Sequence, residues 1–174
     1  MKHVIPKRAF PLLLCLSTLA VPASAQDAAP TREHFAAPGE EADYHQWHYS
    51  PVVKVGDMVI VSGIPAGGEG GYEDKIRRMF EVLRTRLALA GADLADVVEL
   101  TSYHRQPTDT AAFQQEFDRF LRVHREFFPS HYPAWSAVGT TALLNESAPV
   151  ELRAVAMIGS GRAPKAAIPL PPVR

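Results

Sequence analysis

Cysteine is nearly absent from this sequence, because Cys15 is the only one in 174 residues. It lies in a short apolar run that follows the basic segment MKHVIPKR and precedes the small residues ASA. This order is typical of a cleavable secretory signal peptide. We therefore expect residues 1–25 to be a signal peptide cut between Ala25 and Gln26. The mature protein would be periplasmic or secreted, and it would contain no disulfide.

An excess of either charge is also lacking. Lysine and arginine number 18 and aspartate and glutamate 19, which gives a net charge of −1 without any basic block. Phosphate binding usually leaves a basic footprint, so we expect no nucleic acid partner. The N-terminal apolar run is too short to span a bilayer. We therefore expect no membrane association once the signal peptide has been removed.

Several motifs of covalent and metal-dependent catalysis are missing as well. The sequence has no Gly-x-Ser-x-Gly elbow, no His-Glu-x-x-His pair and no cysteine nucleophile in the mature chain. Its seven histidines include His45 and His48 in HQWH, but no set of three or four residues has the spacing of zinc ligands. We expect neither a metal nor a cofactor.

The chain does contain one patterned region between two irregular ends. Residues 26–43 are small, polar and interrupted by proline, which predicts an extended leader with one short edge strand near Phe35. Residues 160–174 are rich in proline and are predicted to form a flexible tail. The region between them, residues 44–159, is long enough for one domain.

The hydrophobic period of this domain alternates between that of strands and that of helices. Two β-branched runs on either side of Gly56 and Asp57 predict a hairpin. Further strands are predicted at 96–103, 135–142 and 149–158, and helices at 73–90 and from the cap Asp109 to just before Pro129. The order β-β-α-β-α-β-β predicts an α+β fold with one mixed sheet, covered on one face by two helices.

The last predicted strand, VELRAVAMI, indicates what each face of the sheet contacts. Leu152 and the alternate residues after it are apolar and suit the face under the helices. Glu151 and Arg153 point the other way, together with apolar residues. A face of this mixed character suits a subunit interface with a polar cleft, so we expect the protein to oligomerise through the uncovered face.

Four segments resemble a known family: YSPVVKVGDMVIVSG, LAGADLADVVELTSYH, YPAWSAVG and VELRAVA. They are similar in order and spacing to the Rid family (reactive intermediate deaminase, formerly the YjgF family), over roughly residues 44–159. The combination of TSYH and YPAWSAVG resembles the YjgH-like branch. The resemblance implies a chorismate-mutase-like fold and a homotrimer that binds small molecules in clefts between neighbouring subunits.

Trp135 departs from the pattern of the deaminating members, which carry an arginine at this position in a Pro-Ala-Arg-Ser motif. The resemblance implies that this arginine holds a substrate carboxylate, for which a guanidinium fork is well matched. An indole offers one donor and a flat face instead. We expect Trp135 to line the cleft and to favour flat, apolar or cationic ligands. The alternative is that Trp135 only packs in the core or in the trimer interface.

The resemblance also assigns roles to four other residues. It implies that Tyr49 lines the cleft, that Ser62 and Gly63 lie where backbone approaches the ligand, and that Glu151 positions and activates water. A structural alternative for Glu151 is a salt bridge to Arg153 or to another subunit.

Two further residues are candidates from their position alone. His104 ends a predicted strand at the expected cleft mouth and is a candidate proton shuttle, with an ordinary surface histidine as the alternative. Arg153 is a candidate anion contact, with an interface ion pair as the alternative. His124, on the apolar stripe of the second helix, is expected to be a hydrogen-bonded core residue.

We therefore expect a hydrolase similar to the 2-iminobutanoate/2-iminopropanoate deaminases, acting on small imines or enamines with altered specificity. The alternative is a non-catalytic periplasmic protein that binds an aromatic or amine-bearing molecule. The ribonuclease or translation-inhibitor activity of some relatives is disfavoured by the signal peptide and the balanced charge.

Overall fold

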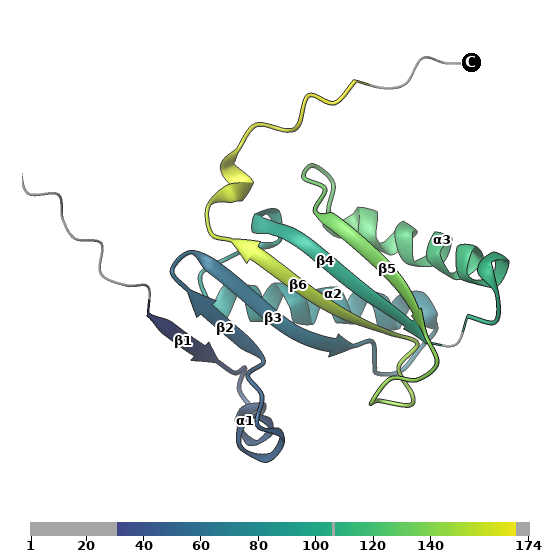
Figure 1. Ribbon diagram of the computed structural model, residues 1–174, viewed down its shortest axis with the longest axis horizontal. Coiled ribbons are helices and arrows are strands. Elements are labelled where there is room, and N and C mark those ends of the chain that lie inside the picture. The colour runs from purple at the N-terminus through teal and green to yellow at the C-terminus, as the bar shows by residue number, and fades with distance from the viewer. Residues whose placement is uncertain (1–30, 106, 170–174) are drawn as a thin grey trace, which may run out of the picture.

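A single mixed sheet of six strands, in the order β1-β2-β3-β6-β4-β5, organises the protein (Figure 1). The computed structural model describes residues 31–105 and 107–169. The expected signal peptide and its cleavage site lie outside these residues. The strands are β1 (Arg32–Phe35), β2 (Val52–Val55), β3 (Met58–Pro65), β4 (Val97–Arg105), β5 (Ala134–Thr140) and β6 (Val150–Met157). The helices are α1 (Glu41–Trp47), α2 (Tyr72–Leu89) and α3 (Thr110–Phe127), with short 3-10 turns η1 (Leu94–Asp96) and η2 (Ser160–Arg162).

The predicted hairpin and the predicted cap of the second long helix are confirmed. Strands β2 and β3 pair antiparallel on either side of Gly56, which has φ +59°, a value that glycine adopts readily. Asp109 accepts a hydrogen bond from the Ala112 amide at 2.8 Å and so caps α3. Gly91 follows α2 with φ +82° and ends that helix. The short strand expected near Phe35 is β1.

Both long helices cover the same face of the sheet, as the sequence predicted (Figure 1). The apolar stripe of α2 meets that of α3, and the Phe80 ring stacks on Phe127 with centroids 5.0 Å apart. Below them, Leu152, Ala154 and Ala156 of β6 are buried, whereas Glu151, Arg153 and Val155 are only partly buried. Each large apolar side chain buried here contributes roughly 1.5–3 kcal/mol, so this layer supplies most of the stability.

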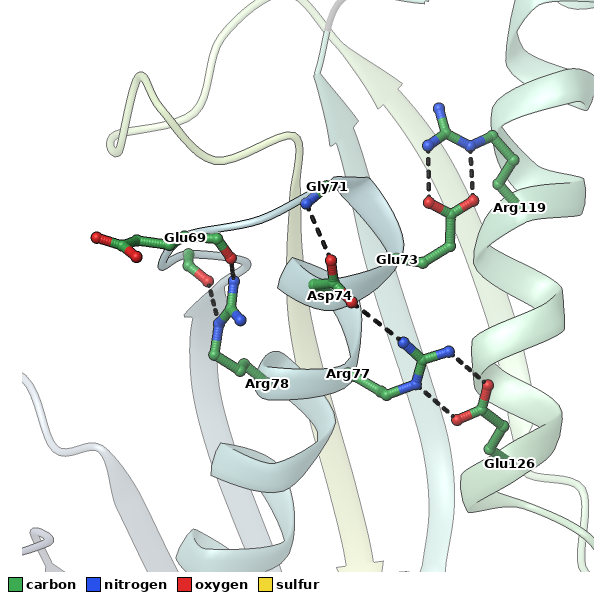
Figure 2. Close-up of polar contacts among 9 residues, drawn as sticks. Glu69, Gly71, Glu73, Asp74, Arg77, Arg78, Arg119 and Glu126 are labelled. Carbon is green, nitrogen blue, oxygen red and sulfur yellow. Dashed lines mark hydrogen bonds and ion pairs between the residues drawn. The ribbon is translucent and has the colours of Figure 1, made fainter.

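Two-pronged ion pairs join α2 to α3 on their outer surface (Figure 2). Arg119 donates to both carboxylate oxygens of Glu73, at 2.9 and 2.8 Å, and Arg77 donates to both of Glu126 at 2.9 Å. The hydrogen bond from Arg119 lowers the pKa of Glu73 to about 2. These pairs are exposed, so they orient the helices more than they stabilise them.

The glycine-rich loop before α2 is anchored to that helix. The Arg78 guanidinium donates to the carbonyl oxygens of Gly67, at 2.9 Å, and of Glu69 (Figure 2). Gly68 has φ +87°, and a Cβ atom there would lie 3.0 Å from the Arg78 Cζ atom. The loop therefore wraps around one arginine side chain.

Helix α1 was not predicted, because it buries none of its side chains and so has no apolar stripe. The segment before α1 is held by an ion pair instead. Glu40, at the N-cap of α1, accepts a hydrogen bond at 3.0 Å from Arg86 of α2. The Arg86 side chain is only 7% exposed, and its other two guanidinium nitrogens have no partner among the described residues.

No helix in residues 31–105 or 107–169 is long and apolar enough to cross a membrane.

Substituting Glu40→Gln should destabilise the protein, because the buried Arg86 guanidinium loses its carboxylate. We expect the free energy of unfolding to fall by about 3 kcal/mol, the lower end for buried pairs, since Glu40 stays partly accessible. Urea denaturation measures this change. Glu33→Gln, which removes an exposed pair with Lys54, is the matched control and should cost less than about 1 kcal/mol. Equal losses in the two variants would contradict the assignment.

Candidate active site

Glu151 lies where β6 passes an irregularity in β3. The pairing of these strands shifts register between Val61 and Ile64, and Gly63 sits within the shift. The Glu151 carboxylate occupies the space above Gly63: a Cβ atom on Gly63 would overlap its Oε1 and lie 2.8 Å from its Cδ. Gly63 is therefore the residue that makes room for the Glu151 carboxylate.

The carboxylate of Glu151 has no hydrogen-bond or ion-pair partner within the described residues. Arg153, the alternative partner expected for Glu151, instead donates a hydrogen bond at 3.0 Å to Glu99 of β4. The prediction of a salt bridge between Glu151 and Arg153 is therefore wrong. Glu151 is half-buried on the uncovered face of the sheet. A partly buried carboxylate held in place without a cation can accept a hydrogen bond from water.

The segment that carries Tyr49 is joined to the same end of β3. The Ser62 hydroxyl donates to the carbonyl oxygen of Ser50 at 2.7 Å, and the Ser62 amide donates to that of Pro51 at 3.0 Å. Tyr49 is half-buried and directly precedes these two residues. The structure thus gathers the Tyr49 segment, Ser62, Gly63 and Glu151, as the family resemblance implied.

Trp135 lies on the other face of the sheet, beneath α3. Its ring stacks on His124, with centroids 4.6 Å apart and an interplanar angle of 17°, and it also contacts Phe117 and Phe120. Its indole N–H donates to the Ser102 hydroxyl at 3.0 Å. Trp135 is only partly buried: it packs against the core, as in the alternative interpretation, and it also lines a cavity together with Tyr132 and Arg125.

His104 is also beneath α3, with an exposed fraction of 0%. Both its expected place at a cleft mouth and the surface alternative are wrong, because β4 extends to Arg105 and carries His104 under the helix. Its Nδ1 lies 3.0 Å from Glu116 Oε1, and its Nε2 lies 2.9 Å from the Ser102 hydroxyl.

Ser102, His104 and Glu116 form a hydrogen-bonded series that ends at Trp135. Since Nδ1 faces a carboxylate, it carries the proton, and Nε2 accepts from Ser102. Tyr72 adds a hydrogen bond to Glu116 at 3.0 Å, and burial, followed by the Glu116 charge, raises the pKa of Tyr72. Ser102 and His104 are fully buried, so no substrate reaches them and the series is structural.

His124 differs in one respect from its expected role. It is buried as predicted, but its Nε2 has no hydrogen-bond partner within the described residues. Burial, and then the neighbouring Arg125 charge, lower its pKa to about 4, so the ring is neutral at neutral pH.

The sheet separates the two groups of candidate residues within one chain. Glu151 pairs in register with Tyr103 and Trp135 with Leu100, and Leu100 is buried under the helices. Sequence reasoning missed Ser102, although its spacing of two from His104 on a strand already places both on one face.

Comparisons with known proteins decide the family. The profile described as Endoribonuclease L-PSP matches residues 41–158. This chain belongs to that family. It is the Rid, or YjgF, family that the sequence resembles, and a YjgH relative supports the YjgH-like branch.

Relatives and solved structures agree with this assignment. RutC family protein YjgH from Escherichia coli is 32% identical over 111 residues, which cover 60% of this chain and 80% of that protein. A Dermatophagoides farinae protein named 2-iminobutanoate/2-iminopropanoate deaminase is 30% identical over 117 residues, covering 63% and 85%. A Mycobacterium tuberculosis structure of the YjgF/YER057c/UK114 family has a TM-score of 0.62 at 28% identity, covering 74% of this chain and 100% of that one. The chorismate-mutase-like α+β fold is confirmed.

Substituting Gly63→Ala should displace the Glu151 carboxylate, because the new methyl group would occupy its place. We expect a loss of about 1–3 kcal/mol in the free energy of unfolding, typical of overpacking. The same substitution made in a Glu151→Ala background should cost at least about 1 kcal/mol less.

Gly67→Ala is the control, because the nearest atom to its Cβ would be 3.9 Å away. Its cost should be the same in both backgrounds. If the cost of Gly63→Ala is also unchanged by Glu151→Ala, Gly63 does not serve to seat the carboxylate.

Proposed function

We propose that this protein hydrolyses small imines or enamines, with Glu151 as the base that activates water. The observation that carries the proposal is the Glu151 carboxylate, seated over Gly63 and without a cation among the described residues. A general base must be placed near the substrate and be able to accept a proton from water, and the position of the carboxylate over Gly63, without an ion pair among the described residues, supports this role for Glu151.

In the proposed reaction, the Glu151 carboxylate accepts a proton from water while the water oxygen attacks the carbon of the protonated imine, whose C=N electron pair passes to nitrogen. The resulting carbinolamine carries the new C–O bond. Glu151 then returns its proton to the nitrogen, and the C–N bond breaks as the hydroxyl oxygen forms the C=O bond and its proton passes to solvent, which releases ammonia and leaves a carbonyl compound. Tyr49 and the backbone near Ser62 and Gly63 would hold the substrate at this end of β3.

The proposed specificity follows from Trp135. In the deaminating members that this chain resembles, an arginine stands at this position and holds a substrate carboxylate. The single donor of Trp135 is already bonded to Ser102 at 3.0 Å, so the indole has no donor left for a carboxylate. We therefore expect the enzyme to lack a strong preference for imines of acidic or small α-amino acids.

The name of one relative supports the proposed hydrolysis. One relative carries the name 2-iminobutanoate/2-iminopropanoate deaminase, while others carry only RutC family names. The retained Glu151 favours chemistry over simple binding. The second candidate is a non-catalytic protein for aromatic or amine-bearing molecules, and the cavity beside Trp135 favours it.

We further propose that the working unit is a homotrimer. Glu151 and Trp135 lie on opposite faces of the sheet of one chain, so a cleft bordered by both needs two copies. The partly buried polar face around Glu151 and Arg153 is the surface we assign to the interface. A sedimentation-equilibrium mass of three chains is expected, and a mass of one chain would contradict the shared cleft.

The proposed activity is tested by coupled assays of imine hydrolysis on protein purified from the periplasm. Determining its N-terminal residue also tests whether cleavage precedes Gln26. Imines are generated from acidic, neutral aromatic and cationic amino acids. We expect turnover of the aromatic imine, and a fall of about a hundredfold or more in Glu151→Gln, since general bases contribute on this scale.

Glu99→Gln is the control, because it makes the same change on the same sheet face, at a residue bonded to Arg153. It should keep the wild-type rate. Background rates on every imine for the wild-type protein would overturn the hydrolase proposal and leave the binding alternative.

A further inference from the structure

A cavity lies between the C-terminal end of α3 and the start of β5. Its volume is about 610 Å³, within the range of small-molecule sites. Its wall includes the rings of Trp135, His124, Phe128 and Tyr132, and Arg125 supplies the charge. We call it the α3–β5 pocket. Within one chain it is on the opposite side of the sheet from Glu151, and Glu151 is not among the residues that line it.

The rings in this wall form an ordered stack. His124 lies between Phe128, at 4.7 Å and 19°, and Trp135, at 4.6 Å and 17°. The Trp135 ring cannot rotate freely, because its N–H is bonded to Ser102. A rigid stack of aromatic rings favours a flat ligand ring, because stacking then adds to the burial of apolar area.

One polar group in the wall has no partner. The Nε2 atom of His124 is buried and makes no hydrogen bond within the described residues, and the residue is 6% exposed. A buried polar atom without a partner is uncommon in a native protein.

The charge of the pocket is positive. Arg119 and Arg122 of the same helix pair with Glu73, whereas Arg125 has no ion pair in the described part of the chain. Lys165 also lies near, with its Nζ 5.8 Å from the ring centre of Tyr132. No carboxylate side chain lines the cavity.

We propose that the α3–β5 pocket binds a small planar aromatic anion. The ring lies against the stack that includes Trp135, and the Arg125 guanidinium holds the negative group. A carboxylate and a phosphate share this chemistry, since a guanidinium binds either. This refines the expectation from sequence, because Arg125 disfavours the cationic ligands that an isolated Trp135 would suit.

Isothermal titration calorimetry on the mature protein tests the proposal with three naphthalene probes. They are 1-naphthoate, the cation 1-naphthylmethylamine and the neutral 1-naphthalenemethanol, which share a ring and differ in charge. We expect 1-naphthoate to bind at least about tenfold more tightly than the other two probes. One charge-assisted hydrogen bond contributes a difference in affinity of this size. Equal binding of the three, or no binding of 1-naphthoate, overturns the proposal.

Two variants locate the binding. Arg125→Gln should weaken 1-naphthoate about tenfold, while Arg122→Gln on the same helix should leave it unchanged. If 1-naphthoate binds more weakly to both variants, or to neither, the assignment of its carboxylate to Arg125 is wrong. Adenosine monophosphate is a fourth probe: tighter binding than 1-naphthoate supports a phosphate ligand, and weaker binding supports a carboxylate.

Glu151→Gln separates this proposal from the proposed hydrolysis. The variant should bind 1-naphthoate as the wild-type protein does, whatever its rate on imines. If Glu151→Gln also loses 1-naphthoate binding, the ligand depends on Glu151 rather than on the Arg125 guanidinium and the inference is wrong.

Discussion

The covering of one sheet face by α2 and α3 is the constraint on which the rest of the structure depends. Side chains alternate along each strand, so a one-sided cover sorts every strand into two sets. On β6 this places Leu152 and Ala154 under the helices and Glu151 and Arg153 outside. On β4 and β5 it places His104 and Trp135 inside. The carboxylate that we propose activates water belongs to the outer set, and the packed aromatic rings belong to the inner set.

Most of the fold was predictable because its signals are local. The hairpin at Gly56, the cap at Asp109 and the alternation along β6 each depend on residues close together in sequence. Helix α1 gave no such signal, since it buries no side chain. The burial of Arg86 was not predictable, because an arginine on a helix is usually exposed. Its burial depends on Glu40, which is 46 positions away in the sequence.

The site was less predictable because its contacts are distant in sequence. Glu151, Gly63 and the Tyr49 segment were identified through family resemblance, and they do lie together. The placement of Trp135 depends on Ser102, 33 positions away, and on three rings of α3. A single sequence names the indole, but it does not say which neighbours take up its face and its N–H. The same holds for His104, whose partner Glu116 comes from α3.

The hydrogen bond from Trp135 to Ser102 also bears on how this branch of the family can evolve. Replacing Trp135 with arginine would place a cation among the rings of Phe117, Phe120 and His124, at the cost of desolvating that charge. It would also remove the packing against His124. A change from tryptophan to arginine at this position therefore requires coordinated changes in the side chains that surround it.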